Sequence, residues 1–128
     1  MATSILVVSV SKYLNGNPIA KGITADWSKA KAHSVASSFE NVGFDLNPND
    51  VAATLRDLRN ILEERLWDGV ILGWCVRGHV EFTVLFEKLI ELCFDVKLRT
   101  PRMKIMFSTG PDNLVETALR NFPVEEKY

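Results

Sequence analysis

Residues 4–10 read Ser-Ile-Leu-Val-Val-Ser-Val, a short continuous run that is rich in β-branched side chains. A strand with one wet face alternates apolar and polar residues, whereas a strand covered on both faces is apolar throughout. The run therefore predicts the central strand of a parallel sheet with helices on both sides. Residues 70–74 form a second apolar run, and residues 104–107 are predicted as the last strand.

Helical patterns separate these strands. Valine and leucine recur at intervals of three and four over residues 51–66, directly after the start signal Asn47-Pro48. Further helices are predicted over 27–39 with Asp26 as the cap, over 79–94, and from Pro111 to Phe122 with Asp112 as the cap; a short strand is predicted over 44–46. Because strands alternate with helices, we predict a small three-layer, doubly wound α/β domain with a four-stranded parallel sheet of order 2-1-3-4.

Length and charge narrow the class of protein. The 128 residues suffice for one domain, residues 1–128, and the net charge of −1 includes no basic tract. We therefore expect no nucleic-acid partner and no membrane partner. The amino terminus has no apolar leader, and two cysteines are too few for a disulfide scaffold, so we expect a cytoplasmic protein with reduced thiols. Neither a metal centre nor a cofactor is predicted.

Two segments have unusual composition for their expected place in the fold. Residues 12–25 are punctuated by glycine and proline and are longer than most connections, which is typical of a lid over a binding site. The helix over 79–94 carries apolar residues around most of its circumference, which predicts a homodimer through this helix. Residues 124–128 are expected to be a loose tail.

Ligands of open parallel sheets bind beyond the carboxyl ends of the strands, where the strand order reverses. Three polar segments follow the predicted strands and therefore share this edge. They contain the candidate substrate-binding residues Ser11, Tyr13, Arg77, Gly78, Ser108, Thr109 and Asn113, and the candidate catalytic residues Lys12, Cys75 and His79.

Arg77 and Gly78 are predicted to lead into a helix, where a guanidinium and free backbone N–H groups would bind a carboxylate or phosphate. Lys12 is a second candidate for contact with an anion. His79 at the start of the same helix would transfer protons, and the thiolate of Cys75 would be favoured there. Simpler interpretations remain open: Arg77 as a solvated loop residue, Cys75 as a buried apolar residue and His79 as a capping residue.

Residues 73–79 look like the nucleophile elbow of class I glutamine amidotransferases, but one extra residue separates Cys75 from the glycine, and no histidine follows His79. A catalytic triad of that kind is therefore not predicted. Residues 68–83 and 107–112 together resemble a group of short, mainly microbial flavodoxin-like or Rossmann-like α/β proteins. This resemblance implies the fold and the importance of the Arg77-Gly78 turn, and it carries no activity.

The leading hypothesis is an enzyme without cofactor that acts on a small anionic or carbonyl-bearing metabolite at the carboxyl ends of the strands. The alternative is a non-catalytic module for ligand binding or oligomerisation, motivated by the apolar helix over 79–94.

Overall fold

The computed structural model describes residues 2–124 and contains a parallel sheet of four strands in the order β2-β1-β3-β4. The strands are β1 (Thr3–Ser9), β2 (Phe39–Asp45), β3 (Gly69–Leu72) and β4 (Lys104–Phe107). β1 is central, and it pairs in parallel with β2 on one side and with β3 on the other. The predicted α/β class, the number of strands and their order are confirmed.

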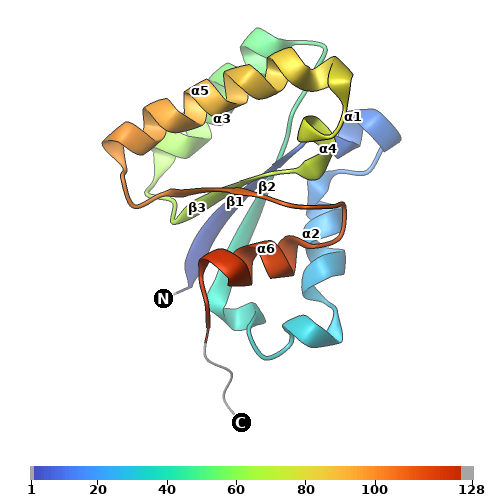
Figure 1. Cartoon of the computed structure of the whole chain (residues 1–128), viewed down its shortest axis with the longest axis vertical. Helices are drawn as coiled ribbons and strands as arrows, with labels where there is room; N and C mark the ends of the chain where they lie inside the picture. Colours follow the sequence, from blue (N-terminus) through green and yellow to red (C-terminus); the bar gives the residue numbers. More distant parts are fainter. Residues whose placement is uncertain (1, 125–128) are drawn as a thin grey trace.

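Helices cover both faces of the sheet (Figure 1). One face carries α3 (Val51–Glu64) and α5 (Thr83–Arg99), and the other carries α2 (Ile19–Trp27) and α6 (Leu114–Asn121). Two short helices, α1 (Ser11–Asn15) and α4 (Trp74–Arg77), follow β1 and β3 directly. The remaining helical turns are of the 3₁₀ type and span Ala30–Ala32, Ala36–Ser38 and Val80–Phe82.

The apolar run of β1 lies between two separate cores. Leu6 and Val8 pack into the core under α3 and α5, whereas Ile5 and Val7 pack into the core under α2 and α6. All four side chains are inaccessible to solvent. The absence of alternation in this run therefore has the predicted cause, because both faces of the strand are covered.

The segment between β1 and β2 differs from the prediction. Residues 12–25 are not a long loop, because most of them lie in α1 and α2, and the helix predicted over 27–39 is wrong. Two 3₁₀ turns occupy that region, and β2 begins at Phe39, well before the short strand predicted over 44–46. At the start of α2, the carboxylate of Asp45 accepts the N–H of Ile19 over 2.8 Å, a contact with a distant residue that the local sequence does not indicate.

The helix predicted over 79–94 begins and ends later in the structure. A turn and a 3₁₀ helix come first, and α5 then runs from Thr83 to Arg99. Its inward residues are Leu85, Leu89, Leu92, Cys93 and Val96, so burial in one core accounts for much of its apolar character. α6 begins at Leu114 and not at Pro111. Of the predicted loose tail, Val124 packs against the second core, and the rest lies outside the described residues.

Candidate functional site

A cavity of about 450 Å³ opens beside the carboxyl ends of β1 and β3. The strand order reverses between these two strands, since the chain moves from β1 to one edge of the sheet and returns to β3. Ligands of doubly wound proteins bind at such a point, and the volume lies in the ordinary range for small-molecule sites. The location predicted from the sequence therefore holds a cavity.

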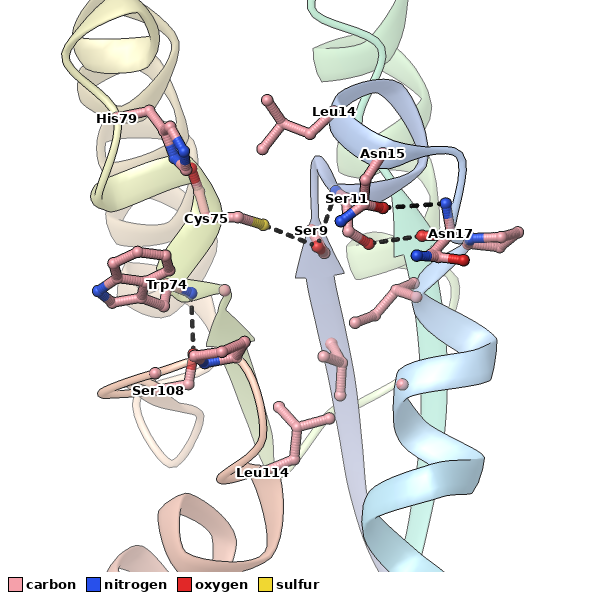
Figure 2. Close-up of a pocket in the computed structure, with 17 residues that line it drawn as sticks. Ser9, Ser11, Leu14, Asn15, Asn17, Trp74, Cys75, His79, Ser108 and Leu114 are labelled. Carbon is pink, nitrogen blue, oxygen red and sulfur yellow. Dashed lines mark hydrogen bonds between the residues drawn. The ribbon is translucent and has the colours of Figure 1, made fainter.

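Polar and apolar side chains both line the cavity (Figure 2). Ser9 and Cys75 face each other in its middle, with His79 and Leu14 on one side of them and Ser108 and Leu114 on the other. The complete lining comprises Val7, Ser9, Ser11, Leu14, Asn15, Asn17, Pro18, Ile19, Gly22, Gly73, Trp74, Cys75, His79, Ser108, Gly110, Pro111 and Leu114. Within residues 2–124, no lysine, arginine, aspartate or glutamate belongs to this lining, so the wall is neutral apart from His79.

The thiol of Cys75 is partly exposed, and its Sγ lies 3.1 Å from the hydroxyl oxygen of Ser9 (Figure 2). The Ser9 hydroxyl is buried and accepts the backbone N–H of Ser11 over 3.1 Å. With one lone pair already engaged, the hydroxyl hydrogen is free to turn toward the sulfur. This arrangement lets Ser9 stabilise a thiolate at Cys75 by a hydrogen bond.

The ring of His79 is fixed by its own turn of chain. Its Nδ1 lies 2.7 Å from the carbonyl oxygen of Cys75. A carbonyl only accepts, so Nδ1 carries a hydrogen and Nε2 is the acceptor of the neutral ring. The rings of Trp74 and Phe82 meet the imidazole edge-on, with centroids 5.7 and 6.0 Å away. His79 thus lines the cavity in one tautomer and one position.

Arg77 and Gly78 do not line the cavity. The guanidinium of Arg77 donates to the carbonyl oxygen of Ser108 over 2.7 Å and lies 6.0 Å from the centre of the Phe107 ring. It therefore joins α4 to the end of β4. A Cβ at Gly78 would lie 2.8 Å from Cε2 of Trp74, so the glycine allows close packing of the indole ring. The structure gives both residues a role in holding the turn.

Of the other predicted residues, some line the cavity and some do not. Ser11 and Ser108 line the cavity, and the Ser108 hydroxyl accepts the N–H of Trp74 over 2.8 Å. Lys12 and Tyr13 are exposed on α1, with the ammonium 5.8 Å from the centre of the tyrosine ring. Thr109 and Asn113 hydrogen-bond to each other beside the cavity and do not line it.

Sequence reasoning missed the wall formed by α1 and α2, including Leu14, Asn15, Asn17 and Ile19. These residues fall in the segment predicted as a lid, and nothing in the local sequence indicates which of them face the sheet. It also missed Leu114, since the predicted start of α6 was three residues too early.

The second cysteine has a different environment from Cys75. Cys93 is fully buried in the core beneath α5, and this burial raises the pKa of its thiol to about 12. A thiol of this kind stays protonated and unreactive near neutral pH. Cys75 is therefore the cysteine available for chemistry.

Comparisons with protein-family models, with curated proteins and with solved structures found no match for this chain. In the part of the chain that the structure describes, no group of three or more histidine, cysteine, aspartate or glutamate side chains is arranged to hold a metal ion. None of the helices formed by residues 2–124 has the length and hydropathy needed to cross a membrane.

Proposed function

We propose that the protein is an enzyme without cofactor that acts on a small carbonyl-bearing molecule in the cavity between β1 and β3. Cys75 is the nucleophile and His79 transfers protons. One observation carries the proposal: a cavity at the point of strand reversal is lined by a half-buried cysteine, a buried hydroxyl 3.1 Å from its sulfur, and an imidazole of defined tautomer.

The chemistry follows from these groups. The sulfur of Cys75 adds to the carbonyl carbon, and the electron pair of the C=O π bond moves to the oxygen. The hydrogen-bond partner of the sulfur is Ser9, so the thiol proton reaches Nε2 of His79 by way of a water molecule, and His79 returns it to that oxygen or to a leaving group. With an ester substrate, loss of the alcohol gives a thioester, which water hydrolyses to regenerate the thiol. No oxidant or reductant is needed.

The apolar part of the lining supports this proposal. Val7, Ile19 and Leu114 offer apolar surface to the body of a ligand, while Ser9 and Cys75 supply a hydroxyl and a thiol in the same cavity. Most small-molecule sites combine a largely apolar wall with a few polar groups in this way. The free state of both thiols fits the cytoplasmic location that we propose for the protein.

The test uses p-nitrophenyl acetate, a small neutral ester whose alcohol is coloured when released. We expect a burst of about one equivalent of nitrophenolate followed by slower turnover, together with one acetyl group on Cys75 by peptide mass spectrometry during turnover. Cys75→Ala should abolish both signals, and His79→Gln should slow them. His33→Gln changes an exposed histidine outside the cavity lining and is the matched control. Equal reactivity of wild type and Cys75→Ala would refute the proposal.

A second candidate is a non-catalytic module formed by two copies of the chain. Three apolar residues of α5 remain exposed although the helix packs on the sheet: Val84, Phe94 and Leu98, with 62%, 55% and 82% of their surfaces accessible. Val80 just before α5 is 86% accessible. Phe94 and Leu98 lie one turn apart on the same side of α5, and exposed apolar residues of this kind are found in association surfaces, which supports the predicted homodimer through this helix.

A further inference from the structure

Helix amino termini at the carboxyl edge of a parallel sheet ordinarily hold anions, because their free N–H groups and the helix dipole attract negative charge. In this protein the two longer helices that begin at the cavity are α2 and α6, and their first residues, Ile19 and Leu114, both belong to the lining. Whether these two termini can attract an anionic ligand therefore depends on which groups already accept their N–H hydrogens.

Carboxylates of the chain itself occupy both termini. At α2, the N–H of Ile19 donates to Oδ1 of Asp45 over 2.8 Å. At α6, the N–H of Leu114 donates to Oδ2 of Asp26 over 3.0 Å. Asp26 is only 4% exposed and comes from a different helix, so its charge is held beside the cavity by the fold. A ligand anion at either terminus would have to approach one of these carboxylates, of which Asp26 is paired with Lys29.

The cations near the cavity are also engaged elsewhere. Nζ of Lys29 lies 3.1 Å from Oδ1 of Asp26, and the guanidinium of Arg77 donates to the Ser108 carbonyl oxygen. At the short helix α4, the first N–H, that of Trp74, donates to the Ser108 hydroxyl. Within the described part of the chain, the lining thus offers an anion no lysine or arginine side chain, and the first N–H of each of the two longer helices is already taken by a carboxylate.

From this pattern we infer that the cavity selects uncharged ligands and disfavours anions. The inference rests on the proposed function and names its substrate class: a neutral aldehyde, ketone, amide or ester with an apolar body. The body would contact Val7, Ile19 and Leu114, and the carbonyl group would lie near Cys75. These observations favour the carbonyl-bearing half of the sequence-based hypothesis over the anionic half.

The test compares two alkylating reagents of nearly equal size, neutral iodoacetamide and anionic iodoacetate, at Cys75. Since both react with the same thiolate, the ratio of their rates cancels the reactivity of the thiol and reports the local charge preference. We expect the ratio of iodoacetamide to iodoacetate rates to be about fivefold larger in the native protein than in the urea-unfolded chain, as for like charges at close range in a partly hydrated site. Peptide mass spectrometry assigns the label.

Two substitutions locate the cause of the preference. Asp45→Asn and Asp26→Asn keep an oxygen that can accept the helix N–H and remove one negative charge each, so each should lower the native ratio. Asp57→Asn removes a carboxylate from the exposed surface of α3, where it pairs with Arg56, and should leave the ratio unchanged. Circular dichroism verifies that each variant is folded, and Asp45→Asn serves alone if Asp26→Asn does not fold.

The outcomes separate the inference from the proposed function. A native ratio equal to or below the unfolded ratio, or a ratio that neither aspartate variant changes, overturns the inference and leaves a reactive cavity in place. Resistance of native Cys75 to both reagents, with normal labelling in urea, shows that the thiol is not accessible and removes the proposed function as well.

Discussion

Asp26 connects two helices that are far apart in the sequence, and its replacement by alanine is predicted to destabilise the whole domain. Its carboxylate accepts the N–H of Leu114 at the start of α6 and pairs with Lys29. Without it, a buried N–H loses its acceptor, which costs about 1–3 kcal/mol. Replacement of a helix-capping residue by alanine typically costs about 0.5–2 kcal/mol. The two ranges refer to the same hydrogen bond and are not added.

The ion pair with Lys29 adds little, since the lysine side chain is 39% exposed. We therefore expect the free energy of unfolding to fall by about 2 kcal/mol in Asp26→Ala, which corresponds to roughly 8 °C in Tm for a domain of this size. Asp26→Asn retains an acceptor oxygen and should lose about half as much. Urea titration followed by circular dichroism measures both variants.

Asp112→Ala is the matched control for Asp26→Ala. The sequence predicts Asp112 as the cap of the last helix, yet α6 begins at Leu114 and takes its acceptor from Asp26. Asp112 is exposed, and its replacement should change stability by less than about 0.5 kcal/mol. If Asp112→Ala costs as much as Asp26→Ala, or more, the assignment of Asp26 as the cap is refuted.

Three further predictions concern other parts of the chain. Gly78→Ala places a methyl group 2.8 Å from an indole carbon and should cost about 1–3 kcal/mol in a urea titration, whereas Gly110→Ala, with no atom within 4 Å of its Cβ, should be neutral. Phe94→Glu should convert a dimer into monomers by light scattering, and a monomeric wild type at high concentration would contradict the predicted association. A hydrogen bond from Arg59 holds the pKa of Asp95 below its ordinary value of 3.8, so the ionised carboxylate contributes to stability above that pH, and this contribution is lost as the pH falls below it. The urea midpoints of wild type and Asp95→Asn should therefore converge in acid. A difference between the midpoints that stays constant with pH would exclude this origin.

The fold was predictable where short segments determine structure by themselves. The apolar runs that became β1 and β3 indicate strands covered on both faces, and alternation with helices then restricts the topology. The prediction failed between β1 and β2, where the start of α2 depends on Asp45, which lies 26 residues later. Local sequence assigned Asp26 to the wrong helix for the same reason, because its partner Leu114 lies 88 residues away.

The site was predictable in position and only partly in composition. The rule of strand ends placed Ser11, Cys75, His79 and Ser108 at one edge, and all four line the cavity. Arg77 follows β3 as Cys75 does, but its guanidinium donates to the backbone carbonyl of Ser108, just after β4, and does not line the cavity. A long cationic side chain can choose among several partners within its reach, and only the folded structure specifies which partner it takes.

The proposed function depends above all on a ligand entering the cavity between β1 and β3. The most direct measurement is a titration of the isotope-labelled protein with cyclohexanone, a neutral ketone that fits a cavity of about 450 Å³, followed by amide chemical shifts. We predict saturable shifts that are largest at Ser9, Cys75 and Ser108. Saturable shifts confined to the exposed side of α5, or no saturable shift at the cavity residues, would contradict the account.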